Sequence, residues 1–112
     1  MKIWVTLFDD VYARDLTGRE MELEELAELV CTTTAPTKDR LPLLKHARFG
    51  SARTPPPDHS LRHDQNVLSV SGLEADYDGE AMPFSEAVAR LESVDIAFFA
   101  HSSPSYAPGK PR

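Results

Sequence analysis

The sequence lacks a long apolar run, and it has a single cysteine in 112 residues. No apolar segment approaches the ~20 residues that a membrane-spanning helix needs. The apolar start MKIWVTLF is short and runs directly into acids, so it does not read as a signal peptide. Cys31 alone excludes an internal disulfide and a cysteine-rich zinc site. We therefore expect a cytoplasmic protein with no membrane contact.

Several catalytic patterns are also absent. The sequence has no Ser-His-Asp arrangement, no glycine-rich phosphate loop and no metalloprotease spacing. Its net charge of −6 argues against a protein that coats nucleic acid. A length of 112 residues, with 41% hydrophobic and 27% charged residues, fits at most one globular domain.

The charges that are present are unevenly distributed. Residues 38–63 carry six basic residues against two acids, a local excess of four positive charges, and three of the four histidines. The basic residues are Lys38, Arg40, Lys45, Arg48, Arg53 and Arg62. A basic central segment beside acidic segments suits a phosphate-bearing substrate, but from charge alone an uneven surface without a ligand is the more ordinary interpretation.

Local patterns predict a mixed α/β (α+β) chain in the order strand, helix, loop, strand, helix, strand. Residues 37–65 hold three consecutive prolines and are expected to be irregular. Gly72 indicates a bulge or a close backbone approach. Ser85 is the expected N-cap of the second helix, and Cys31 is expected to be buried. The predicted strands are residues 2–8, 66–78 and 95–103, and the predicted helices are residues 20–30 and 83–94.

The segment ADYDGE carries two aspartates, Asp76 and Asp78, one residue apart. At the end of a strand, both carboxylates would point to the same side and could share a Mg²⁺ or Mn²⁺ ion. The alternative is an exposed acidic turn, because Asp-Gly is a common turn pair. A calcium loop of the EF-hand type is excluded, since Ala81 stands where that loop requires glycine.

Two further segments carry candidate phosphate ligands. HSSPSYAPGKPR offers hydroxyl groups together with Lys110 and Arg112, and its alternative reading is a solvated loop. LKHARFG offers Lys45 and Arg48 to phosphates and an aromatic ring for stacking or packing, while its histidine reads as a surface residue.

In this order, LPLLKHARFG, LRHDQNVLSVSGLEADYDGE and AFFAHSSPSYAPGKPR resemble the amino-terminal part of primase-polymerase domains of the archaeo-eukaryotic primase superfamily. The similarity covers residues 38–112 and is strongest to domains from phages, plasmids and integrated elements, which are often joined to a helicase. It implies a single partial domain over residues 1–112, with a third motif expected beyond Arg112.

The resemblance also implies roles for individual residues. Asp76 and Asp78 would be the catalytic metal ligands, holding Mg²⁺ or Mn²⁺. Arg48, Ser103, Ser105, Tyr106 and Lys110 would contact the incoming nucleoside triphosphate, with single-stranded DNA as the template. Tyr106 stands where related sequences commonly carry histidine.

The expected function is therefore the amino-terminal part of a metal-dependent DNA primase-polymerase, inactive as an isolated chain. A non-catalytic module is the alternative, which would dimerise or dock on a partner chain through an unpaired sheet edge. A metal-dependent phosphoesterase or nuclease that uses the same aspartates is a third possibility.

Overall fold

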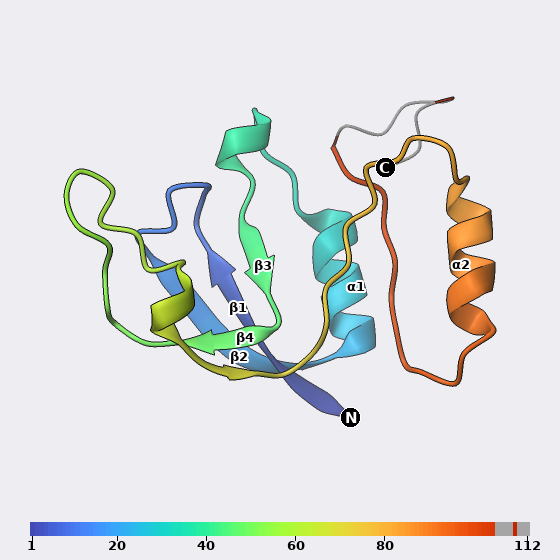
Figure 1. Ribbon diagram of the computed structural model, residues 1–112, viewed down its shortest axis with the longest axis horizontal. Helices are drawn as coiled ribbons and strands as arrows, with labels where there is room; N and C mark the ends of the chain where they lie inside the picture. Colours follow the sequence, from blue (N-terminus) through green and yellow to red (C-terminus); the bar gives the residue numbers. More distant parts are fainter. Residues whose placement is uncertain (105–108, 110–112) are drawn as a thin grey trace. The chain divides into compact units, whose positions relative to one another are not determined.

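The computed structural model describes residues 1–104 and residue 109, and it divides into two compact units (Figure 1). Unit 1 comprises Met1–Glu74 and unit 2 comprises Ala75–Arg112. All five strands of the described residues lie in unit 1, together with one α-helix, whereas the helix of unit 2 is α2 (Phe84–Glu92). The molecule is a small mixed α/β protein, as the local patterns predicted, and the strand pairs of the described residues are antiparallel.

The centre of unit 1 is a hairpin of two seven-residue strands, β1 (Lys2–Phe8) and β2 (Leu16–Glu22). They pair antiparallel in continuous register from Lys2 opposite Glu22 to Phe8 opposite Leu16. The short strand β3 (Leu43–Lys45) pairs with the other edge of β1. The sheet order β2-β1-β3 therefore places the predicted first strand in the middle, where its apolar residues are covered.

The two faces of β1 contribute to different parts of the core. Val5 and Met21 lie on one face of the hairpin and are almost fully buried, as is Leu26 of α1 (Leu23–Thr32). On the opposite face, Phe8 forms a cluster with Ala13 and Leu61, and partly buried Leu16, Leu43 and Phe49 pack around it.

A second sheet of two strands, β4 (Ala47–Phe49) and β5 (Val67–Val70), joins this opposite face. The Phe49 ring meets the Phe8 ring edge-on, with centroids 5.0 Å apart. The buried Thr6 hydroxyl donates a 2.6 Å hydrogen bond to the Ala47 carbonyl. Polar and apolar contacts thus fix β4 against β1.

The long connection between β4 and β5 is ordered by its own hydrogen bonds. It ends in the short 3-10 helix η2 (Asp64–Asn66), and a similar turn, η1 (Lys38–Arg40), precedes β3. The Asn66 amide donates to the Gly50 and Leu61 carbonyls and accepts from the Ala52 N–H. This single buried side chain therefore ties both ends of the loop together.

Several predicted elements differ from the structure at their ends. The helix predicted from residue 20 begins at Leu23, because residues 20–22 complete β2 opposite residues 2–4. Glu22 instead caps α1, exchanging hydrogen bonds with Glu25 in a capping box. β3, β4 and the first four residues of β2 fall in segments that were not predicted to be strands, and the last three residues of β2 were predicted to be helical.

The predicted strand over residues 66–78 ends at Val70, because its partner β4 extends only over Ala47–Phe49. Residues 95–103 form no strand, and no strand of the described residues pairs with them. The second helix is confirmed as Phe84–Glu92, but Pro83 rather than Ser85 occupies its N-cap. Cys31 is exposed, not buried.

Gly72 confirms the close backbone approach expected there. A Cβ atom at Gly72 would lie 2.9 Å from Nδ1 of His46. Neither helix of the described residues is long and apolar enough to cross a membrane.

Candidate functional site

The acid pair lies in unit 2, on the chain that leads toward α2. Asp76 and Asp78 are both exposed and belong to no strand. The prediction that they lie at the end of a strand is therefore wrong. The other reading, an exposed acidic segment, describes their surroundings better. Exposure of both residues to solvent avoids the desolvation cost of buried acids.

Tyr77 organises the turn that follows the two aspartates. Its hydroxyl accepts hydrogen bonds from the backbone N–H groups of Met82, at 2.8 Å, and Ala81, at 3.1 Å. The ring lies against Gly79, where a Cβ atom would come within 2.6 Å of it. Glycine is therefore required beside Asp78 to let the tyrosine ring close over the backbone.

The chain that precedes the acid pair is fastened within unit 1. The Ser71 N–H donates to the His46 carbonyl at 2.8 Å, and the Ser71 hydroxyl donates to the Trp4 carbonyl. The Glu74 carboxylate accepts from the His46 N–H at 3.2 Å and lies 3.5 Å from Nζ of Lys45. The chain is thus held as far as Glu74, two residues before Asp76.

The donor chemistry of the acid pair fits a hard divalent cation. Asp76 and Asp78 offer carboxylate oxygens, which Mg²⁺ and Mn²⁺ prefer. Within the described residues, no group of three or more His, Cys, Asp or Glu side chains is arranged to hold a metal. A cation at the pair would complete its shell with water and substrate oxygens, as Mg²⁺ commonly does.

Arg48 is exposed on β4 and is held by an aromatic contact. Its guanidinium carbon lies 3.6 Å from the centroid of the Trp4 ring. This cation–π stack fixes the arginine while leaving its N–H groups at the surface. The sequence led us to expect Arg48 as a phosphate ligand, which stays a prediction, and it gave no sign of the contact between Arg48 and Trp4.

The other residues expected to bind the nucleotide begin with Ser103, the last residue of the segment 95–103, which forms no strand. Ser103 is half-buried and follows His101 by two residues in the chain; the His101 ring stacks on Phe99 with centroids 5.8 Å apart. Ser105, Tyr106 and Lys110 lie outside the described residues.

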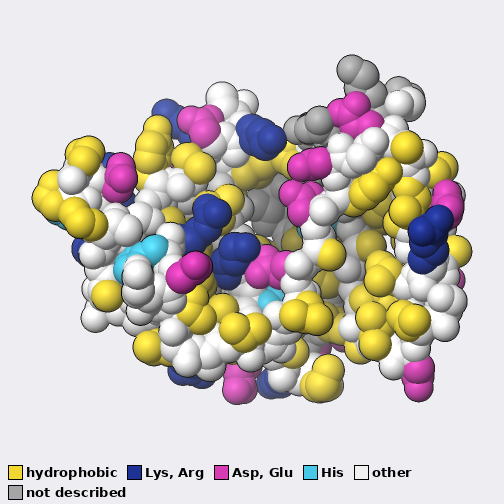
Figure 2. Space-filling model, in the orientation of Figure 1, with side chains coloured by type: hydrophobic (Ala, Val, Ile, Leu, Met, Phe, Trp, Pro, Cys, Tyr) yellow, Lys and Arg dark blue, Asp and Glu magenta, His cyan; other side chains and the backbone are white. Residues whose placement is uncertain are grey.

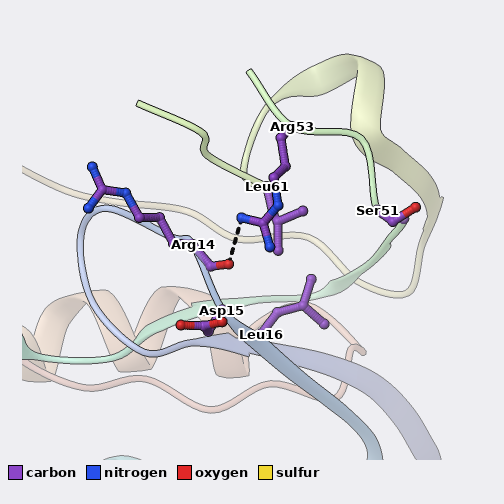
Figure 3. Close-up of a pocket in the computed structure, with 7 residues that line it drawn as sticks. Arg14, Asp15, Leu16, Ser51, Arg53 and Leu61 are labelled. Atoms are coloured by element: carbon purple, nitrogen blue, oxygen red, sulfur yellow. Dashed lines mark hydrogen bonds between the residues drawn. The ribbon is translucent and has the colours of Figure 1, made fainter. Parts of the chain in front are cut away.

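The connection between β4 and β5 contains Pro55, Pro56 and Pro57, and we call it the proline loop. A pocket of about 340 Å³ lies beside it and is lined by Arg14, Asp15, Leu16, Gly50, Ser51, Arg53 and Leu61 (Figure 3). The two arginines of this pocket donate hydrogen bonds to backbone carbonyls. Arg53 donates to the carbonyls of Arg14, at 2.9 Å, and His59, at 3.0 Å. Arg14 Nε donates to the Asp58 carbonyl at 3.0 Å. These contacts give the cations of this pocket a structural role.

A second pocket, of about 330 Å³, is formed by β4, β5, η2 and the chain after β5. We call it the β4–β5 pocket and define it by Lys45, His46, Ala47, Phe49, Arg62, His63, Asp64, Val67, Val70, Gly72 and Glu74. Figure 2 shows basic, acidic and histidine side chains gathered over this part of unit 1. The sequence analysis did not predict this pocket, although the concentration of basic residues and histidines in residues 38–63 could have indicated a site there.

Comparison with known proteins found no matching family model, and no significant match among curated proteins or solved structures.

Proposed function

We propose that the chain is the amino-terminal part of a primase-polymerase domain from the replication machinery of a mobile element. The observation that carries this proposal is the exposed pair Asp76 and Asp78, set beside the Tyr77 turn. The resemblance of the flanking segments to the archaeo-eukaryotic primase superfamily supports it. Nucleotidyl transfer would belong to the intact domain.

In this proposal the chain's own residues present ligands and fix their backbone. The Tyr77 hydroxyl holds the N–H groups of Ala81 and Met82, which limits the conformations open to the aspartates beside it. Asp76 and Asp78 would hold Mg²⁺ or Mn²⁺, which would supply positive charge against the phosphates of a nucleoside triphosphate. Arg48, Ser103, Ser105, Tyr106 and Lys110 are the proposed phosphate contacts.

The test is calorimetric titration of the 112-residue chain with Mn²⁺, alone and with a non-hydrolysable deoxynucleoside triphosphate. We expect metal-dependent nucleotide binding. Replacing both acids, Asp76→Asn with Asp78→Asn, should weaken Mn²⁺ binding by at least about tenfold, because both anionic ligands are lost.

A matched control removes two other exposed acids of unit 2, Glu92→Gln with Asp95→Asn. It changes the net charge by the same amount, so it should leave Mn²⁺ binding within about twofold of the parent if the effect is local. Equal losses in the two double variants would assign the binding to diffuse negative charge. An unchanged affinity in the Asp76/Asp78 variant would overturn the metal assignment.

A second candidate function, self-association, is favoured by one observation. β5 pairs only with β4 among the described strands, and it carries exposed Leu68 and Val70, with fully exposed Leu73 close behind. An unpaired edge with apolar side chains is a template for strand pairing with another chain. A chain that binds neither metal nor nucleotide but forms dimers would support this function.

A further inference from the structure

The pocket beside the proline loop, which we call the Arg53 pocket, contains an arginine whose position is fixed by backbone carbonyls. Nη1 of Arg53 donates to the Arg14 carbonyl at 2.9 Å, as drawn in Figure 3, and to the His59 carbonyl at 3.0 Å. A guanidinium group has five N–H donors, and these two bonds use both hydrogens of Nη1. Nε and Nη2 bond to no described residue, so a complete two-donor edge remains for a carboxylate.

Asp15 supplies the opposite charge in the same pocket. Arg53 bonds to the peptide group that joins Arg14 to Asp15, so its guanidinium lies beside the backbone of the acid. Asp15 is exposed, and its carboxylate makes no hydrogen bond or ion pair with any described residue. The Arg14 guanidinium bonds instead to the carbonyls of Pro57 and Asp58 and points away from Arg53 in Figure 3. The pocket therefore presents one cation and one anion, which disfavours a bare anion as its ligand.

Two leucines form the apolar part of the pocket. Leu16 is half-buried and directly follows Asp15, and Leu61 is 6% exposed. The Leu61 N–H donates to the Ala13 carbonyl at 2.8 Å, which ties the proline loop to the turn between β1 and β2. A volume of about 340 Å³ is enough for a small molecule that carries an apolar group.

Backbone strain also concentrates beside this pocket. Three non-glycine residues of the described chain have a positive φ, and two of them adjoin the pocket. Ala13, with φ 53°, directly precedes Arg14. His59, with φ 50°, supplies one of the carbonyls that fix Arg53. Strained residues of this kind cluster at ligand sites, where the surrounding contacts hold them in place.

We propose that the Arg53 pocket binds a free α-amino acid with an apolar side chain. The carboxylate of the ligand accepts hydrogen bonds from Nε and Nη2 of Arg53, and its ammonium group donates to the Asp15 carboxylate. Its side chain packs on Leu16 and Leu61. The argument uses no metal, no nucleotide and no residue of unit 2, so this proposal and the proposed function fail separately.

The test is an NMR titration of the ¹⁵N-labelled 112-residue chain with L-leucine, at neutral pH and in the presence of a chelator. We expect amide shifts centred on residues 13–16, 50–53 and 59–61, with a dissociation constant of about 1–10 mM for so small a ligand. Leucinamide lacks the carboxylate and N-acetyl-leucine lacks the ammonium group, so each should bind at least about fivefold more weakly. The two analogues test both charge contacts without altering the protein.

A matched pair of variants tests the role of the acid. Asp15→Asn should weaken L-leucine binding by about fivefold, because the ammonium group loses its anionic partner. Glu28→Gln, the same charge change at an exposed residue of α1 outside the pocket, should leave binding unchanged. The proposal is overturned if Asp15→Asn binds L-leucine as tightly as the parent, if either analogue binds as tightly as L-leucine, or if the folded parent shows no shifts in these residues at about 50 mM ligand.

Discussion

At the scale of single residues, Asn66 shows how a polar side chain can organise a long loop. It is 2% exposed, and its amide meets backbone groups of Gly50, Ala52 and Leu61. Its own N–H donates to the His63 carbonyl at 3.0 Å, which closes η2. The proline loop therefore depends on a buried asparagine, because its sequence cannot form a regular ladder.

We expect Asn66→Ala to lower the free energy of unfolding by about 2–3 kcal/mol, because it leaves the Ala52 N–H and the Leu61 carbonyl without their buried partner. Urea denaturation followed by circular dichroism measures this change. Gln65→Ala removes the neighbouring exposed amide and should change stability by less than about 0.5 kcal/mol. A similar small change for both variants would show that water replaces the Asn66 bonds.

At the scale of elements, the β1–β2 hairpin contains a stack of three residues. Trp4 packs so closely on Gly18 that a Cβ atom there would lie 2.4 Å from its ring. Arg48 lies 3.6 Å from the same ring, and the Trp4 indole N–H donates to the Thr6 hydroxyl at 3.2 Å. The hairpin, β4 and the buried Thr6 hydrogen bond are thereby linked through one side chain.

Gly18→Ala should displace the Trp4 ring and loosen the Arg48 contact, at a cost of about 1–3 kcal/mol. Trp4 is the only tryptophan, so its fluorescence should shift to longer wavelength in the folded variant. Thr17→Ala, an exposed change next to it on β2, is the matched control and should leave the emission unchanged. Parent-like emission from the Gly18 variant would contradict the described packing.

Elements with strong local signals were predicted correctly, whereas those defined by pairing were not. β1 is a dense β-branched and aromatic run, and α2 has clear helical spacing, so both were found. β2 reads LTGREME, in which Leu16 and Met21 are the only large apolar residues, so the local pattern does not indicate a strand. Its existence, and the late start of α1, follow from pairing with β1, which no local pattern reports.

In the candidate sites, too, features with a local sequence signal were predicted, whereas features that depend on strand pairing were not. Asp76 and Asp78 are neighbours in sequence, so the pair could be recognised without a structure. The exposure of the two aspartates could not be predicted from the sequence, because it depends on the end of β5 at Val70, opposite the first residue of its partner strand β4. The β4–β5 pocket brings Lys45, Arg62 and Glu74 together only after β4 and β5 pair.

At the scale of the whole molecule, the chain consists of a sheet-containing unit and a smaller helical one. Leu68 and Val70 are 66% and 68% exposed on β5, and nothing in unit 1 pairs with the outer edge of that strand. This is the edge through which the proposed self-association would take place.

If the edge mediates pairing, the chain should sediment as a concentration-dependent dimer, and Leu68→Lys should shift the population toward monomer by about tenfold in the dissociation constant. Analytical ultracentrifugation under reducing conditions measures both. Val11→Lys, which also replaces an exposed apolar residue with a charge, is the control and should leave the dimer in place. A strictly monomeric parent would remove self-association as a function.

The exposure of Cys31 has a practical consequence. It is the only thiol, it lies near the end of α1, and it does not line either pocket. A maleimide dye or spin label would therefore attach at one defined point of unit 1 and leave the candidate sites untouched. The same thiol allows two chains to join through a disulfide in air, which would produce a covalent pair unrelated to β5.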